Sequence, residues 1–280
     1  MTLARRGLFA GLAGLLGGCS PATLLNATVS RQGFTREADI AYGTDPRQKL
    51  DIYLPSGPVA RAPVAFFIYG GSWSSGDRGT YGFVGDAFAS RGYVTVIADY
   101  RLVPEVRFPA FIEDGATALA TVRRIIGRYG GDADRLHLLG HSAGAYNAMM
   151  LALDPRYLAR AGVPRSAIRA AAGLSGPYDF LPLDVAATRA AFGNARNPAE
   201  TQPISFARRG APRIFLGTGT ADTTVLPRNT DALAARLQGA GVPVMVRKYD
   251  GVGHAGTVLA LAPLLRFTPV LDDVTRFFGA

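Results

Sequence analysis

The chain has 280 residues, of which 48% are hydrophobic and 18% are charged, so it can bury a sizeable core and lacks the composition of a disordered protein. That length accommodates one large domain or two small ones. The formal net charge is +9, but nearly all cations are arginines scattered along the chain, and no basic run is interleaved with aromatic residues, which argues against a nucleic-acid partner.

The first 18 residues have the three parts of an export signal. Arg5 and Arg6 form a positive start, and an apolar stretch over 7–17 follows that is too short to span a bilayer as a permanent helix. The sequence LGGC ending at Cys19 then resembles the bacterial lipobox, and Cys19 is the only cysteine. We therefore expect an export signal of lipoprotein type over 1–18 and a lipid anchor on Cys19. The anchor would hold the protein on a membrane of the cell envelope, in the outer membrane or facing the periplasm.

An ordinary cleaved signal with an incidental Cys19 is the alternative. The arginine pair also loosely resembles a twin-arginine signal, so the export route stays open.

A polar tether over 19–35 is followed by a single predicted domain over 36–280. In that domain, short apolar or alternating runs predict strands, and segments of helical periodicity predict helices. Strands are expected near 37–42, 49–55, 63–69, 93–98, 136–139, 168–174, 213–217 and 243–249, and helices near 80–90, 111–128, 143–153, 227–238 and 269–278. This alternation predicts an α/β fold, with a mostly parallel central sheet and helices on both of its faces.

Ser142 is the candidate nucleophile. It is the central residue of Gly140-His141-Ser142-Ala143-Gly144, which matches G-x-S-x-G between a predicted strand and a predicted helix. A serine on such a turn projects its hydroxyl above the sheet, and the glycines leave room for the turn. The alternative is a small residue in a tight turn without a chemical role.

His254 is the candidate base, because serine needs a neighbouring base to act as a nucleophile. Of the three histidines, His137 lies inside a predicted strand, and His141 adjoins Ser142 and should point away from it. His254 lies in a glycine-rich loop after the last strand, where it can reach over the sheet edge. A surface histidine without a role is the alternative.

The base needs a carboxylate to orient it, and Asp222 is the favoured candidate over Asp250. Asp222 follows the strand at 213–217, and the order Ser142, Asp222, His254 is that of the α/β-hydrolases. The alternative role of Asp222 is to bond the backbone of its own turn.

The tetrahedral oxygen of acyl transfer needs backbone N–H donors. Ala143, directly after the nucleophile, is expected to supply one. Gly71 and Ser72, in the loop after the strand at 63–69, are candidates for the other. A glycine pair that forms only a turn is the alternative.

Several segments together resemble bacterial carboxylesterases of the α/β-hydrolase superfamily, near the acetyl-xylan/feruloyl esterase-like and hormone-sensitive-lipase-like branches. They are LDIYLP (50–55), YGGSWSSGD (69–77), ADYRLVPEVRFPAFIED (98–114), LGHSAG (139–144), SGPYD (175–179), GTADTTV (219–225) and GVGH (251–254). The resemblance implies a single α/β-hydrolase domain with a short cap region. One departure is Tyr69, where the family usually has a loop-ordering histidine.

We therefore expect a serine carboxylesterase that hydrolyses short-chain acyl esters, such as acetyl or feruloyl groups on carbohydrate, without a metal or other cofactor. Trp73, Tyr146 and Tyr178 are the candidate lining of the substrate pocket, with plain packing as the alternative. An amidase of the arylformamidase type and a non-catalytic binding protein are the rival functions. The oligomeric state stays open.

Overall fold

The structure is a computed structural model and describes residues 34–279. The predicted export signal, Cys19 and the tether up to residue 33 lie outside the described residues. Among residues 34–279, no helix has the length and apolar character needed to cross a membrane.

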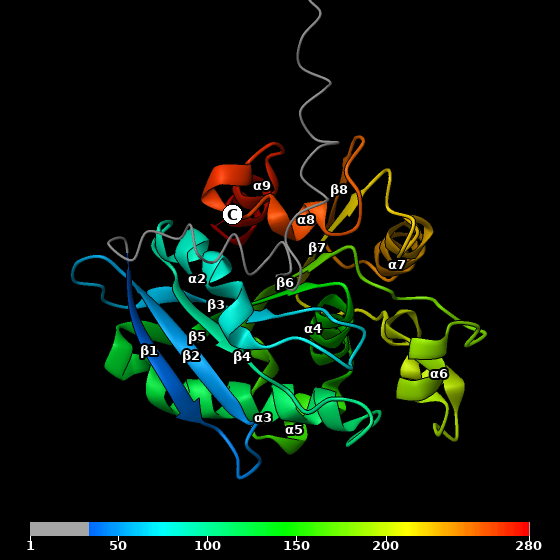
Figure 1. Cartoon of the computed structure of the whole chain (residues 1–280), viewed down its shortest axis with the longest axis horizontal. Helices are drawn as coiled ribbons and strands as arrows, with labels where there is room; N and C mark the ends of the chain where they lie inside the picture. The colour runs from blue at the N-terminus through cyan, green and yellow to red at the C-terminus, as the bar shows by residue number, and fades with distance from the viewer. Residues whose placement is uncertain (1–33, 280) are drawn as a thin grey trace, which may run out of the picture.

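Within residues 34–279, eight strands form one sheet in the order β1-β2-β4-β3-β5-β6-β7-β8 (Figure 1). The strands β1 and β2 are antiparallel to their neighbours, and the strands from β4 to β8 are parallel to one another. Their bounds are β1 Phe34–Ala41, β2 Lys49–Pro55, β3 Ala62–Ile68, β4 Val94–Ala98, β5 Gly131–His141, β6 Ile168–Leu174, β7 Arg213–Gly219 and β8 Val244–Tyr249.

Helices cover both faces of this sheet, as predicted. α2 and α9 contact each other on one face, and α3, α4 and α5 contact one another on the other face (Figure 1). α7 packs on β7 and β8. The helix bounds are α2 Gly82–Ala89, α3 Ala110–Ile125, α4 Ala143–Leu153, α5 Pro155–Arg160, α6 Ala186–Phe192, α7 Arg228–Gly239, α8 Gly256–Leu259 and α9 Val270–Gly279.

The centre of the sheet is the most deeply buried part of the molecule. β3 reads APVAFFI and is almost wholly buried, and every residue of α4 is buried against the sheet. Strands covered on both faces need such continuous apolar runs, which is why they could be found in the sequence.

The short elements differ from the prediction. β5 begins at Gly131 rather than near 136, because Gly131 pairs with Ala62 before the apolar part of the strand starts. α5, α6 and α8 have four to seven residues each and were not predicted, since they are too short to show a helical period. α6 lies at one end of the molecule (Figure 1), where Phe192 of α6 contacts Tyr146 of α4 with ring centroids 5.2 Å apart, and it forms the body of the expected short cap.

Candidate active site

Ser142 lies on the sharp turn that joins β5 to α4. Its backbone has φ 55° and ψ −123°, a combination that residues with a side chain adopt only under strain. The turn is possible because its two flanking glycines touch backbone directly. A Cβ on Gly140 would lie 2.2 Å from the carbonyl oxygen of Gly144, and one on Gly144 would lie 2.0 Å from that of Ile68. The G-x-S-x-G pattern is therefore a steric requirement of this turn.

The structure brings Ser142, His254 and Asp222 into one hydrogen-bonded chain, although 80 or more residues separate the serine from the other two. His254 Nε2 lies 2.9 Å from Ser142 Oγ, and His254 Nδ1 lies 2.9 Å from Asp222 Oδ2. A carboxylate only accepts hydrogen bonds, so Nδ1 carries the proton and Nε2 accepts from the serine hydroxyl. His254 is thus held in the tautomer that a general base needs.

Asp222 is fully buried, and its second oxygen is also satisfied. Oδ1 accepts from the backbone N–H groups of Thr224 and Val225 at 3.0 and 2.9 Å. The two roles weighed for Asp222, turn residue and partner of the base, therefore coexist in one side chain. Asp250 is exposed and accepts from Thr220 Oγ1 at 3.2 Å.

The loop of His254 is held by three side chains for which the sequence indicated no role: His141, Thr257 and Ser175. His141 Nε2 lies 3.1 Å from the carbonyl oxygen of His254 and donates to it, and Thr257 Oγ1 donates to the same oxygen at 3.3 Å. Ser175 Oγ in turn pairs with Thr257 Oγ1 at 3.0 Å. Burial, and next the nearby His254, lowers the pKa of His141 to about 3, so this ring is neutral and its Nε2 is a donor.

The loop after β3 approaches the nucleophile from the other side. A Cβ on Gly70 would lie 2.9 Å from the Cβ of Ser142, so this glycine packs directly against the serine. Gly71, Ser72 and Trp73 all have positive φ. The carbonyl of Gly71 accepts from Ser74 and Ser75, which closes the turn.

Ser72 and Ala143 line the same cavity as Ser142, whereas Gly71 is not among its lining residues. The N–H of Ala143 is at the first turn of α4, where backbone donors have no acceptor within the helix. The arrangement favours Ala143 and Ser72 as the donors to an oxyanion, with Gly71 in the turn directly before Ser72.

Tyr69 takes a structural part in the same loop. Its hydroxyl donates to Asp99 Oδ1 at 2.8 Å and accepts from Arg47 Nη2 at 2.9 Å, and its ring is stacked with those of Tyr81 and Tyr100. The hydroxyl of Tyr100 donates to the Tyr69 carbonyl at 3.0 Å. With tyrosine in place of the usual histidine, the loop is thus anchored through both the side chain and the backbone carbonyl of Tyr69.

The cavity in front of Ser142 has a volume of about 350 Å³. Its wall includes Trp73 and apolar residues of the cap region, among them Phe180, Leu181 and Val185, with Leu226 from the loop before α7. Leu181, Val185 and Leu226 are exposed at 39 to 56% and all line this one cavity. These three residues form the apolar rim of the cavity.

Tyr146 and Tyr178 lie elsewhere than expected, since both are fully buried and neither lines this cavity. Tyr146 is on the all-buried helix α4, where its hydroxyl donates to the Thr201 carbonyl. Tyr178 packs against Gly173 and Gly176. Tyr146 follows the LGHSAG segment and Tyr178 belongs to the SGPYD segment, which is why both were expected near the site. Their side chains instead point into the protein, where they pack the cap region onto the sheet.

Within the described residues, no group of three or more histidine, cysteine, aspartate or glutamate side chains is placed to hold a metal ion.

Comparison with known proteins places the chain in a family. The BD-FAE family model matches residues 50–237, about two thirds of the sequence. The chain belongs to the BD-FAE family. The BD-FAE match contains the turn of Ser142 and the loop of Asp222, and His254 follows it in the chain.

Individual proteins similar to this BD-FAE member are named as esterases. A probable isoprenylcysteine alpha-carbonyl methylesterase of rice (Oryza sativa subsp. japonica) is 29% identical over 246 residues, which cover 79% of this chain and 57% of the rice protein. Esterase LipQ of Mycobacterium tuberculosis is 30% identical over 272 residues, covering 89% of this chain and 63% of that protein. The chain thus spans less than two thirds of each.

Among solved structures, esterase 2 of Thermogutta terrifontis with butyrate bound superposes with a TM-score of 0.72. It is 22% identical and is covered to 96%, with 91% of this chain aligned. This similarity confirms the predicted α/β-hydrolase fold.

Proposed function

We propose that this protein is a serine carboxylesterase that hydrolyses short-chain acyl esters through an acyl-enzyme. The observation that supports this most directly is the hydrogen-bonded chain from Ser142 through His254 to Asp222, set at a cavity that Ala143, the first residue of α4, also lines. The esterase names of the similar proteins point the same way.

In the proposed reaction, Ser142 Oγ attacks the ester carbonyl while His254 Nε2 takes the hydroxyl proton. Asp222 keeps the Nδ1 proton in place and stabilises the imidazolium. The negative charge on the carbonyl oxygen is stabilised by the N–H groups of Ala143 and Ser72. Collapse breaks the bond to the leaving alkoxide, which receives the proton from His254. Water then attacks the acyl-serine, with His254 again as the base. The second intermediate collapses by breaking the bond to Ser142 Oγ, which takes the proton back from His254 as the carboxylic acid leaves.

The cavity supports a small acyl group. Its volume of about 350 Å³ is at the lower end of the range for ligand pockets, and its rim is apolar. We propose acetyl and other short acyl groups, such as acetyl on carbohydrate, with the larger aromatic feruloyl group on carbohydrate as the second candidate. The butyrate bound to the Thermogutta esterase is of this size class.

The test is hydrolysis of p-nitrophenyl acetate, butyrate and octanoate by the protein and by its Ser142→Ala variant. We expect turnover that falls from butyrate to octanoate and a loss of at least about 10⁴-fold in the variant, because the nucleophile is gone. A Ser205→Ala variant, at a serine outside the cavity lining, should keep full activity. Folded protein that cleaves formanilide but none of the three esters would instead support the amidase.

We also propose that the protein is exported and carries a lipid on Cys19, on the basis of the leader and its lipobox-like end. Labelling with radioactive palmitate in a bacterial host should mark the wild type but not Cys19→Ser. Equal labelling of both would refute the anchor, and absence of label on an exported protein would favour an ordinary cleaved signal.

A further inference from the structure

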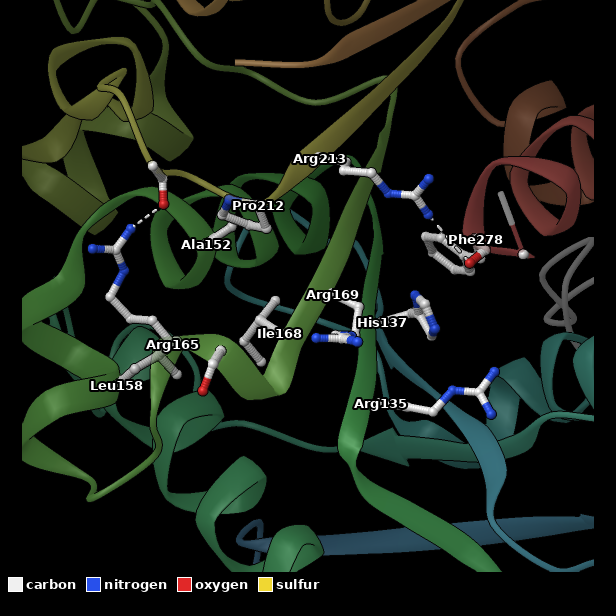
Figure 2. Close-up of a pocket in the computed structure, with 13 residues that line it drawn as sticks. Arg135, His137, Ala152, Leu158, Arg165, Ile168, Arg169, Pro212, Arg213 and Phe278 are labelled. Carbon is white, nitrogen blue, oxygen red and sulfur yellow. Dashed lines mark hydrogen bonds between the residues drawn. The ribbon is translucent and has the colours of Figure 1, made fainter. Parts of the chain in front are cut away.

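A second hollow opens at the opposite end of the parallel strands from Ser142. It has a volume of about 560 Å³ and lies where β5, β6 and β7 begin, whereas the candidate active site lies where the parallel strands end. Figure 2 shows its lining, which includes Phe278 of α9 on one side and Ala152 of α4 and Leu158 of α5 on the other. Neither the proposed esterase reaction nor the sequence motifs involve this region.

The hollow is lined by four arginines, Arg135, Arg165, Arg169 and Arg213, and by no carboxylate among the described residues. Within residues 34–279, none of the four makes an ion pair with an aspartate or glutamate. By contrast, Arg61, Arg123 and Arg156 each pair with an aspartate. Three of them donate to backbone carbonyls: Arg213 to Phe277 at 2.7 Å, Arg135 to Arg61 at 3.3 Å, and Arg165 to Gly210. A carbonyl does not neutralise a guanidinium, so the positive charge of the hollow is uncompensated.

His137 stands among three of these arginines. Its ring is 3% exposed, lies 4.6 Å from the ring of Phe278 in a stacked arrangement, and has Arg135, Arg169 and Arg213 around it (Figure 2). Burial, and next the charges of Arg135, Arg213 and Arg169, lowers the pKa of His137 to about 4. Its Nδ1 is buried without a hydrogen-bond partner. A buried polar atom without a partner is uncommon in a folded protein and is a reason to look for a missing ligand.

The register of the sheet places this histidine on the same face as Arg213. His137 on β5 pairs with Ala170 on β6, and Ala170 pairs with Arg213 on β7. Residues paired across parallel strands point to the same face, so the small Ala170 stands between two long polar side chains. His137 and Arg213 therefore lie on one face of the sheet, and both line the hollow.

We infer that this hollow is a binding site for a phosphate-class oxyanion carried by a small molecule, held by Arg135, Arg169, Arg213 and His137. Guanidinium groups present paired N–H donors that match the oxygens of phosphate, and their bonds to it are charge-assisted. The hollow is larger than one phosphate group requires. Its remaining wall, with Ala152, Leu158 and Ile168, is apolar and suits the uncharged part of such a molecule.

The test measures binding of inorganic phosphate and of glycerol 3-phosphate to the full chain by calorimetry, with thermal unfolding as a second readout and sodium chloride at equal ionic strength as the salt control. The site variant is Arg135→Gln combined with Arg169→Gln. Both side chains are exposed, so their loss leaves the core intact. The matched control is Arg236→Gln, an exposed arginine on α7 outside the hollow.

We expect the site variant to raise the Kd for both anions by at least about tenfold, and Arg236→Gln to change it less than about twofold. Without anion, the site variant should unfold at the same temperature as the wild type or higher, because like charges have been removed. An equal Kd for wild type and site variant, stabilisation by sodium chloride equal to that by phosphate, or no binding of either anion would each overturn the site.

A third arm identifies the source of the phosphate. Sedimentation with phosphatidylglycerol vesicles compares the wild type with the site variant, so that binding through the N-terminal segment cancels. A larger bound fraction for the wild type assigns the site to a lipid headgroup. Equal fractions, together with tighter glycerol 3-phosphate binding by the wild type, assign it to a soluble phosphorylated molecule.

Discussion

Replacing His141 by glutamine removes a buried titrating ring while keeping an N–H donor near the carbonyl of His254. In the wild type, burial lowers the pKa of His141 from 6.5 to about 3. The folded protein therefore keeps this ring neutral between these values, whereas the unfolded chain protonates it. The stability that depends on the neutral ring is fully present above pH 6.5 and is lost as the pH falls toward the folded pKa.

The size of this loss follows from the two pKa values. Between about pH 7 and pH 5, His141 removes about 2 kcal/mol from the free energy of unfolding. A domain has only about 5–15 kcal/mol in total, so the change is large enough to measure. His137 titrates in the same direction but is present in both proteins, so its effect cancels in the comparison.

The assay is urea unfolding of the wild type and of His141→Gln at about pH 7 and about pH 5, followed by far-UV circular dichroism. We expect the wild type to lose about 2 kcal/mol more than the variant on acidification. A matched variant, His141→Leu, also removes the titration but leaves the His254 carbonyl with only Thr257, so it should lower esterase activity where His141→Gln largely keeps it. An identical pH dependence in wild type and His141→Gln would refute the reasoning.

Further predictions concern the base, the turn and the rim. Asp222→Asn should lower kcat/KM by about a thousandfold or more, because the amide cannot orient the imidazole, while the exposed Asp250→Asn stays within about twofold. Loss of activity in Asp250→Asn alone would reverse this assignment. Gly144→Ala should destabilise the protein by about 3 kcal/mol, since its Cβ would meet the Ile68 carbonyl at 2.0 Å. Gly127→Ala, which meets nothing within 4 Å, should be neutral in thermal unfolding. Leu226→Asn at the apolar rim should lower the preference for butyrate over acetate by about threefold, and an unchanged ratio would place the acyl group elsewhere.

Buried parallel strands and the turn of Ser142 could be read from the sequence because their determinants are local. A strand covered on both faces needs a nearly continuous apolar run, and β3 shows one, as do β4 apart from Thr95 and β6 after Arg169. The strained serine turn requires glycines at fixed spacing, and the chain order of serine, aspartate and histidine follows from the order of strands in the sheet. The placement of Ser142, His254 and Asp222 in contact was therefore predictable, while their catalytic role stays a prediction.

Only the tertiary structure decided which side chains meet when they are distant in sequence and lack a motif. The contact of His141 with the His254 carbonyl and the anchoring of Tyr69 by Arg47 and Asp99 depend on how loops from different strands pack. The inward direction of Tyr146 follows from α4 being buried on all sides, which a motif position does not reveal. His137 and Arg213 line the same hollow because the register sets them on one face of the sheet, and register is a property of strand pairing across the sheet rather than of any one segment.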